Sequence, residues 1–302
     1  MKIASISRAD GSTQWGLSDG QSFLAPASAG VDLPLDLVSA IQVSDWREQL
    51  RPALRQLHDG GGQWIRADQL AAPLVLGRNV FCLGPNYSDH AAESAHSPGV
   101  PAEPVYFSKA TTTLAPPVHS LPLDRSLTTR LDWEVELAVV IAVGGRNIDE
   151  ATALDHVLGY SVAIDFSARD VQEGRPEGQW FLGKSIDGYF PLGPWIVTTD
   201  EIPDPQALRI ELTVNGVVKQ HATTEAMLFP VRRIIADLSR YVTLQPGDVI
   251  STGTPGGVGN ARDPQEHLAE GDRVVATISG IGSVTTTIVP TSGRSATTPG
   301  AS

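Results

Sequence analysis

The segment at residues 131–143, LDWEVELAVVIAV, constrains the fold of this chain more than any other stretch. Its carboxylates Asp132, Glu134 and Glu136 stand at alternate positions, so in a β-strand they would share one face. Trp133 would then point to the opposite face, and the apolar run that follows predicts a buried strand. Two interpretations remain open. The carboxylates form a solvated strand face, or they point inward and require a cation, because burying unpaired carboxylates is prohibitively costly.

The composition favours a turn-rich β architecture over a helical bundle. The chain has 302 residues, of which 41% are apolar and 19% charged, with 29 glycines and 22 prolines. This length allows one large domain, or a core domain with a smaller one. The net charge of −12 and the lack of a basic run argue against nucleic acid and anionic membrane surfaces as partners. Local positive charge would therefore have to attract any anionic substrate.

Cysteine content and hydropathy indicate an intracellular setting. Cys82 is the only cysteine, which predicts neither an intrachain disulfide nor a thiolate metal cluster. The N-terminal stretch lacks the apolar core of a signal peptide. No apolar run approaches the roughly 18 residues of a membrane span. We therefore expect a soluble cytoplasmic protein.

Hydrophobic spacing divides the chain into three parts. Residues 2–24 alternate loosely around Asp-Gly pairs, which is typical of a hairpin. Residues 45–57 have helical spacing that places Leu50, Leu54 and Leu57 on one face. The end of the chain is small and polar, which is typical of disorder. We predict a small N-terminal α+β domain over residues 1–75, a β-rich main domain over residues 76–290, and a disordered tail over residues 291–302.

Within the main domain, short apolar stretches predict mostly strands. One clear helix interrupts them, because Phe229-Pro230 is a typical helix start and an apolar stripe follows at helical spacing. The stripe consists of Val231, Ile234, Ile235 and Leu238. We read it as a core face, and the fold class as mixed α/β and β-rich.

Asp165 is the second unusual carboxylate, because it lies in the otherwise apolar stretch YSVAIDFS. Alone, such an aspartate is more often a turn residue or a member of an ion pair. A hard divalent cation, however, prefers oxygen ligands from several carboxylates. Glu134 and Glu136 on one strand supply two ligands and Asp165 would supply the third, so together they favour a metal site.

His90 and Glu93 are the candidate base and its partner. On a helical turn, residues three apart share a face and can touch. A carboxylate behind an imidazole sets its tautomer and raises its basicity, as a general base requires. The alternative is a loop histidine near a solvated glutamate. Other catalytic signatures are missing from the sequence, including a phosphate-binding Gly-Lys-Ser/Thr loop, a dinucleotide-binding glycine motif and a nucleophile elbow.

Several motifs occur in one order along the chain, and this order carries a resemblance. They are NYSDHAAE at 86–93, FSKATTTL at 107–114, EVE at 134–136, DFSARD at 165–170, GKSIDGYFPLGP at 183–194 and PGDVISTGTPGGVG at 246–259. Over roughly residues 78–289 the chain resembles the fumarylacetoacetate hydrolase superfamily. The resemblance implies a β-roll catalytic domain, preceded by the small variable N-terminal domain of short bacterial members. Ile164, where the family often has Asn, and Pro85 depart from the family pattern and leave the particular substrate open.

The resemblance also implies a site. Glu134, Glu136 and Asp165 would bind Mg²⁺ (or Mn²⁺), leaving Asp132 at the strand end as an expected partner of Arg130. The implied catalytic residues are His90 and Glu93, which activate water, and Lys184, which stabilises an enolate oxygen. The implied substrate-binding residues are Arg169, Gln172, Thr254 and Lys109. For Arg169 and Lys109 a purely structural role remains an equal alternative.

The function that the resemblance implies is hydrolysis of a C–C bond in a 2,4-dioxo acid of the acylpyruvate or fumarylpyruvate type, through a metal-stabilised pyruvate enolate. A decarboxylase or an enol–keto isomerase of 2-oxo diacids is the alternative within enzymes. A non-catalytic module in which the metal only staples two strands is the alternative outside them. A small anionic 2-oxo acid is the expected substrate, and a homodimer is the expected assembly.

Overall fold

The computed structural model describes residues 1–93 and 100–291. Of the predicted tail, only Thr291 is described, and its hydroxyl donates a hydrogen bond to the Leu123 carbonyl at 2.8 Å. Residues 292–302 lie outside the described residues, so the prediction made for them stays a prediction. Among the described residues, none of the helices has the length and apolar character that crossing a bilayer requires.

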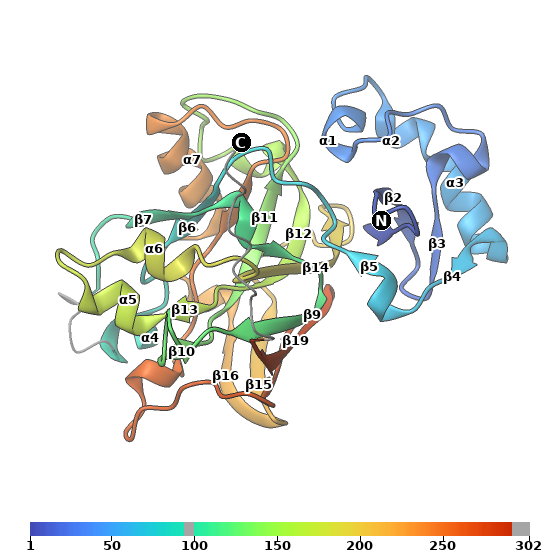
Figure 1. Cartoon of the computed structure of the whole chain (residues 1–302). Helices are drawn as coiled ribbons and strands as arrows, with labels where there is room; N and C mark the ends of the chain where they lie inside the picture. The colour runs from blue at the N-terminus through green and yellow to red at the C-terminus, as the bar shows by residue number, and fades with distance from the viewer. Residues whose placement is uncertain (94–99, 292–302) are drawn as a thin grey trace, which may run out of the picture.

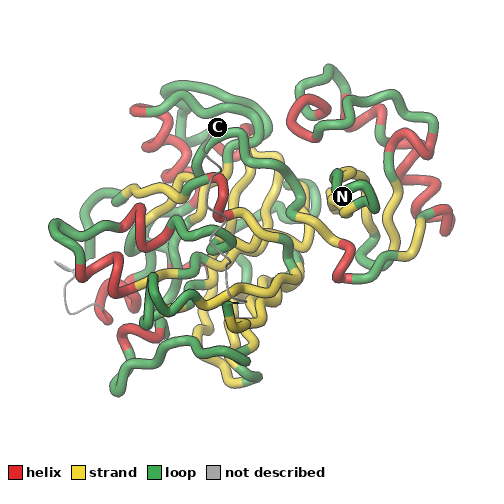
Figure 2. The backbone as a smooth tube through the Cα atoms, viewed as in Figure 1, coloured by secondary structure: helices red, strands yellow, loops and turns green. Residues whose placement is uncertain are grey.

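One large sheet runs through the molecule, and strands dominate the fold (Figures 1 and 2). Its order is β4-β3-β2-β1-β14-β12-β11-β17-β6-β7, with β5 paired to β1 and β8 paired to β14. Its strands are β1 (Lys2–Ser7), β2 (Thr13–Ser18), β3 (Ser22–Leu24), β4 (Gln63–Trp64), β5 (Leu70–Ala71), β6 (Val80–Leu83), β7 (Tyr106–Lys109), β8 (Leu114–Ala115), β11 (Val135–Ile141), β12 (Val157–Ile164), β14 (Phe190–Thr198) and β17 (Val249–Ser251).

A second sheet and a short ribbon complete the β structure. The second sheet has the order β16-β15-β18-β19-β9, and β10 pairs with β13 separately. The strands are β9 (Val118–Leu123), β10 (Leu131–Asp132), β13 (Ser167–Ala168), β15 (Arg209–Val214), β16 (Val217–Thr223), β18 (Arg273–Ile278) and β19 (Gly282–Pro290). The helices are α1 (Leu37–Ala40), α2 (Trp46–Gln49), α3 (Arg51–Gln56), α4 (Ser88–Glu93), α5 (Arg169–Gly174), α6 (Trp180–Lys184) and α7 (Val231–Tyr241). The predicted mixed α/β, β-rich class is confirmed.

The long helix α7 begins where the sequence predicts. Pro230 precedes it, where its missing N–H costs nothing, and the helix continues to Tyr241. The predicted apolar stripe is buried in the main core, which it shares with strands of both sheets. It therefore has a packing role.

Strand β11 separates two apolar cores. Its odd-numbered residues, such as Leu137 and Val139, belong to the core shared with the second sheet. Its even-numbered residues Ala138 and Val140 belong to the core shared with the N-terminal elements. Neighbours β12 and β17 pair with it on either edge. A strand buried on both faces needs an apolar sequence, which explains the run that follows Glu136.

The N-terminal elements lie to one side of the molecule but join the large sheet (Figure 1). Strands β1 and β2 form the predicted hairpin. Strand β1 also pairs with β14, with Ile3 opposite Ile196. Leu50 and Leu57 are buried in the core that contains β11 residues. The predicted domain boundary at residue 75 therefore stays a prediction. Backbone pairing of β1 with β14 connects the N-terminal part to the main part of the chain.

Candidate active site

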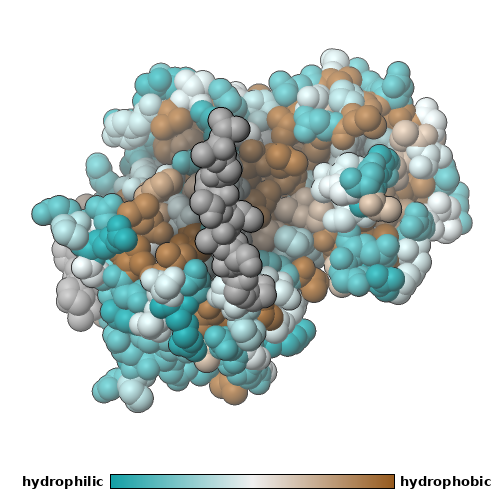
Figure 3. Space-filling view, in the orientation of Figure 1, coloured by the Kyte–Doolittle hydropathy of each residue, from teal (hydrophilic) through white to brown (hydrophobic). Residues whose placement is uncertain are grey.

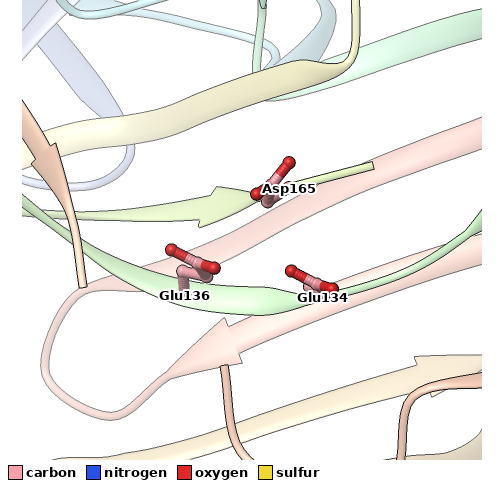
Figure 4. Close-up of side chains that lie close together, drawn as sticks. All are labelled: Glu134, Glu136 and Asp165. Atoms are coloured by element: carbon pink, nitrogen blue, oxygen red, sulfur yellow. The ribbon is translucent and has the colours of Figure 1, made fainter. Parts of the chain in front are cut away.

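The register of β11 against β12 brings the three predicted metal ligands together. Val135 lies opposite Ile164, so Glu134 comes opposite Asp165, whose N–H donates to the Glu134 carbonyl at 2.8 Å. Side chains of opposed residues share a face of the sheet, and Glu136 lies two residues along the same face. One oxygen from each of the three carboxylates lies within 4.8 Å of the other two, and the three side chains lie close together (Figure 4). We call Glu134, Glu136 and Asp165 the carboxylate triad.

The acidic row of the sequence is buried. Asp132 and Glu136 are 0% exposed and Glu134 is 5% exposed, which excludes the solvated-face interpretation. The backbone also leaves the strand conformation between β10 and β11, at Trp133 and Glu134. The predicted continuous strand is thus two strands, and burial of its carboxylates demands compensating charge.

Two members of the triad receive that charge from basic side chains. Lys184 Nζ donates to Glu134 Oε2 at 2.7 Å and to Asp165 Oδ2 at 2.9 Å. Lys109 Nζ donates to Asp165 Oδ1 at 2.6 Å. Arg169 Nη2 donates to Glu134 Oε1 at 2.6 Å. Burial works against the charged form of Glu134, but Lys184 and Arg169 outweigh it and lower the pKa of this carboxyl to about 2.

Glu136 has no basic partner among the described residues. Its Oε2 accepts hydrogen bonds from the Ser251 hydroxyl and, at 3.0 Å, from the Gly253 N–H. Its Oε1 is buried without a hydrogen-bond partner. Burial, together with the nearby Asp165 and Glu134 carboxylates, raises the pKa of Glu136 to about 8. An uncompensated buried oxygen beside two further carboxylates fits the ligand set of a hard divalent cation.

The two lysines of the site differ in what they can contact. Burial opposes the charge of Lys184, but Asp165 and Glu134 raise its pKa overall, and Lys184 lines the cavity described below. Lys109 is fully buried, and burial lowers its pKa. Its other hydrogen bonds go to the carbonyls of Phe166 and Lys184, and its Nζ lies 6.0 Å from the centroid of the Phe190 ring. Lys109 is not among the residues that line the cavity, and its contacts are those of a supporting residue, the structural alternative left open for it.

Arg169, rather than Arg130, is the partner of Asp132. The Nε of Arg169 donates to Asp132 Oδ2 at 2.8 Å, and Nη1 donates to Gln172 Oε1 at 3.0 Å. The prediction that Asp132 pairs with Arg130 is therefore wrong. Burial opposes the charge of Arg169, but Asp132 and Glu134 outweigh it and raise its pKa further. Arg169 thus bridges alternate carboxylates of the acidic row, a contact that strand spacing alone does not reveal.

A cavity of about 800 Å³ opens beside the triad. Its lining contains most of the predicted site residues, namely His90, Glu93, Glu134, Glu136, Arg169, Gln172, Lys184 and Thr254. Sequence reasoning assigned no site role to further polar and aromatic lining residues, namely Phe107, Arg130, Glu173, Trp180, Asn260, Arg262, Asp263 and Gln265. Phe107 and Trp180 pack edge to face with ring centroids 5.4 Å apart. Figure 3 shows apolar side chains gathered on the surface over α6, the helix that carries Trp180.

The His90–Glu93 pair lies on α4 at the cavity, in the predicted i, i+3 arrangement. His90 Nδ1 and Glu93 Oε2 are 3.6 Å apart, too far for a hydrogen bond, and both atoms lack a partner among the described residues. The other oxygen, Glu93 Oε1, accepts from the Gly257 N–H at 2.6 Å. The glycine-rich loop therefore holds one end of the pair. Catalytic hydrogen bonds are often this long without substrate.

Thr254 lines the cavity with its hydroxyl already engaged. The hydroxyl donates to the Val135 carbonyl at 2.9 Å and accepts from Gln220 Nε2 at 2.7 Å. The Oε1 of Gln220 in turn accepts from the Val135 N–H at 2.9 Å. The predicted donation from Thr254 to a substrate would require this network to rearrange.

The main part of the chain is similar in sequence to known proteins. A family model described as the C-terminal region of fumarylacetoacetate (FAA) hydrolase matches residues 79–289. A mitochondrial oxaloacetate tautomerase from Xenopus laevis is 43% identical over 220 residues, which are 73% of this chain and 68% of that protein.

Two solved structures share the fold. A fumarylacetoacetate hydrolase from psychrophilic Exiguobacterium antarcticum has a TM-score of 0.80 and 33% identity, covering 96% of this chain and 99% of that one. A maleylpyruvate hydrolase from Sphingobium sp. SYK-6, solved with manganese(II) and pyruvate, has a TM-score of 0.74 and 27% identity, covering 96% and 99%. The matched segment contains the triad, the His90–Glu93 pair and Lys184, and the chain belongs to the fumarylacetoacetate hydrolase family.

Proposed function

We propose that the chain is a divalent-metal-dependent hydrolase that cleaves a C–C bond in a 2,4-dioxo acid of the acylpyruvate or fumarylpyruvate type. The observation that supports this proposal most is the pairing of two features in one cavity. Glu136 is a buried carboxylate without a basic partner among the described residues, and His90 is a base candidate with an unpartnered ring nitrogen. Relatives named as hydrolases and as a tautomerase agree with enzymatic chemistry on enolisable 2-oxo acids.

Glu134, Glu136 and Asp165 would hold the metal. We propose Mg²⁺, with Mn²⁺ as the alternative, because both prefer carboxylate oxygens. When bound, the ion would act as a Lewis acid toward the oxygens of a 2-oxo acid, on which negative charge develops. The maleylpyruvate hydrolase solved with manganese(II) supports a divalent ion in this family.

The residues of this chain supply the proton transfers. His90 removes a proton from water, Glu93 orients the imidazole, and the resulting hydroxide attacks the 4-carbonyl carbon of the substrate. The adduct collapses by breaking the C3–C4 bond, so one product is a carboxylic acid and the other is the pyruvate enolate. The His90 imidazolium returns its proton to C3 of that enolate. General-base help of this kind is worth roughly 10²–10⁴ in rate.

Lys184 and Arg169 would stabilise the developing charge. Lys184 Nζ carries three protons, of which two go to Glu134 and Asp165, leaving one N–H for an enolate oxygen. Arg169 and Gln172 lie at the cavity, where they could hold a substrate carboxylate. Their positions are set by the buried carboxylates, so the donors are already oriented before substrate binds.

Enol–keto tautomerisation of oxaloacetate is the second candidate. The 43% identical tautomerase favours it, and the reaction needs a base and enolate stabilisation but no attacking water. A substrate panel with Mg²⁺ separates the two candidates. We expect turnover of acylpyruvate or fumarylpyruvate to pyruvate. Turnover of enol-oxaloacetate without cleavage of any dioxo acid would overturn the hydrolase proposal in favour of the tautomerase.

Two further proposals concern assembly and the role of the metal. We propose a homodimer, and a monomeric mass by light scattering at working concentration would contradict it. In the non-enzymatic alternative, the metal only holds two strands together. A chelator would then lower the melting temperature, and the metal-loaded protein would have no enzymatic activity. We expect the chelator to abolish turnover as well.

A further inference from the structure

Two arginines line the same cavity as Glu134 and Glu136, and neither has an ion pair with a triad carboxylate in the described part of the chain. We propose that Arg130 and Arg262, which we call the arginine region, bind a second, distal carboxylate of the substrate. The preferred substrates would then be 2,4-dioxo diacids rather than monoacids with an apolar end. This inference rests on the proposed function, because it assumes that the 2-oxo acid end of the substrate lies at the triad.

The charge of Arg130 is only weakly compensated. Its Nη2 reaches the side-chain oxygen of Asn260 and, at 3.4 Å, that of Gln265, which are both neutral. Its nearest carboxylate is that of Glu173, 3.5 Å away in an ion pair whose side chains are 32% and 38% exposed. The buried Nε has no partner among the described residues. Exposed ion pairs contribute little, so most of the binding capacity of this guanidinium is unused.

Arg262 is held by neutral groups. Its Nη2 donates to the carbonyls of Lys219 at 2.8 Å and Gly257 at 3.3 Å. Its only carboxylate contact in the described chain is Glu266 at 3.8 Å, and Glu266 is already paired with Lys219 Nζ. The Nε of Arg262 is also buried and unpartnered. Carbonyls therefore orient the guanidinium and leave its positive charge available.

Charge and size together favour a carboxylate as the group bound here. The guanidinium fork matches a carboxylate in two parallel hydrogen bonds, and burying one of its N–H groups without a partner is costly. A chain with a net charge of −12 repels a dianion overall, so local cations have to retain it. The cavity of about 800 Å³ lies near the upper end of the roughly 300–1,000 Å³ of small-molecule sites. A small diacid such as oxaloacetate would leave most of it empty.

A matched pair of substrates tests the proposal. 2,4-Dioxoheptanedioate and 2,4-dioxoheptanoate have the same chain length and differ only in the terminal carboxylate. We expect the wild-type Mg²⁺ enzyme to prefer the diacid by at least about 10-fold in kcat/KM. In Arg262→Gln, kcat/KM for the diacid should fall by about 10- to 100-fold, mostly through KM, as expected for loss of a charged hydrogen bond. The monoacid should change less than about 3-fold.

Further variants keep the test decisive if Arg262→Gln disturbs the loop that Arg262 anchors. Arg130→Gln removes a different guanidinium and should show the same selectivity change. Arg262→Lys keeps the charge without the fork and should recover only part of the diacid preference. Arg125→Gln, an exposed arginine paired with Glu270 at 3.6 Å, is the matched control and should change neither substrate. Equal losses for diacid and monoacid in both Gln variants would overturn the proposal.

A binding measurement separates failure of this inference from failure of the proposed function. If the wild type hydrolyses neither substrate, the hydrolase proposal fails. Calorimetry with 2-oxoheptanedioate and 2-oxoheptanoate on the Mg²⁺-loaded protein then tests whether the arginine region binds a distal carboxylate. Tighter binding of the diacid that is lost in Arg130→Gln and Arg262→Gln would support it. Equal affinity for the two ligands would overturn it.

Discussion

The arginine region lines the same cavity as Glu134 and Glu136 of the triad, but charge is compensated differently in the two regions. In the triad, Glu134 and Asp165 are buried and fully engaged by Lys184, Arg169 and Lys109. In the arginine region, the guanidinium groups are partly exposed and rely on neutral oxygens. The triad lacks a cation at one oxygen of Glu136. In the arginine region, the ion pairs among the described residues are long, at 3.5 Å from Arg130 to Glu173 and 3.8 Å from Arg262 to Glu266.

This difference indicates which parts of the site are built in advance. Buried charges must be compensated within the protein, because no water is available to solvate them. Groups at the edge of the cavity can keep unused binding capacity, since solvent and substrate both reach the cavity. The triad therefore should tolerate little change, whereas the arginine region should tune selectivity. The following predictions test this contrast, from the largest expected effect to the smallest.

Replacing Glu136 should have the largest effect. Glu136→Ala removes the one triad carboxylate without a basic partner in the described chain, so we expect activity to be lost. Mg²⁺ affinity measured by calorimetry should fall by more than the roughly 10- to 100-fold typical of residues that only orient a ligand. Glu211→Ala, at an exposed glutamate paired with His221, is the control. A Glu136→Ala enzyme that stays fully active at micromolar Mg²⁺ would refute the metal assignment.

Replacing His90 should separate catalysis from metal binding. In His90→Ala, acylpyruvate hydrolysis should fall by about 10²–10⁴ because no base remains to activate water. Metal affinity should stay near wild type, since His90 is not a ligand. Glu93→Gln should act in the same direction more weakly. The rate of oxaloacetate decarboxylation, if present, should fall much less than the rate of hydrolysis. An equal fall in both rates would assign His90 to a proton step common to both reactions and would favour the tautomerase as the function.

A smaller effect should follow from adding a side chain at Gly256, which lies next to Glu93 of the His90–Glu93 pair. A Cβ at Gly256 would lie 2.8 Å from Glu93 Oε1 and 3.1 Å from Asp89 Cγ, so Gly256→Ala should displace the Glu93 carboxylate. Misplacement of this size should cost about 10- to 100-fold in kcat for hydrolysis, with metal affinity unchanged. Gly174→Ala, where an added Cβ meets no atom within 4 Å, is the matched control. Equal kcat values in both variants would show that the loop does not position Glu93.

The smallest expected effect is a pH dependence of metal stabilisation. The pKa of Glu136 is raised to about 8. The folded, metal-free protein therefore keeps the Glu136 carboxyl protonated from its ordinary pKa up to about pH 8. The stability that this bound proton contributes is lost as pH rises through about 8. Metal must displace the proton, so the increase in melting temperature produced by Mg²⁺ should grow from pH 6 to pH 8. A constant increase across this range would argue that Glu136 is ionised throughout.

Much of the fold and of the triad could be predicted from sequence, because short-range patterns carry the information. Alternation of carboxylates with apolar residues indicated the strand, and the proline-initiated stripe indicated α7. The order of motifs identified the family. The apolar context of Asp165, beside the alternating Glu134 and Glu136, indicated the third ligand candidate. The His90-x-x-Glu93 spacing indicated a shared helical face, and the two side chains do lie on one short helix.

Other features depended on where distant segments meet. The sequence by itself determined a β-rich chain with carboxylates at alternate positions of one stretch, since spacing within one strand sets which side chains share a face. That these carboxylates are buried, and so need compensating charge, was decided by the tertiary structure. Only the tertiary structure decided that Arg169 rather than Arg130 neutralises Asp132, and that Arg130 and Arg262 line the cavity. It also decided that Lys109 is buried behind Asp165. These partners lie far apart in sequence, and strand register and loop packing bring them together, so no local pattern encodes the contact.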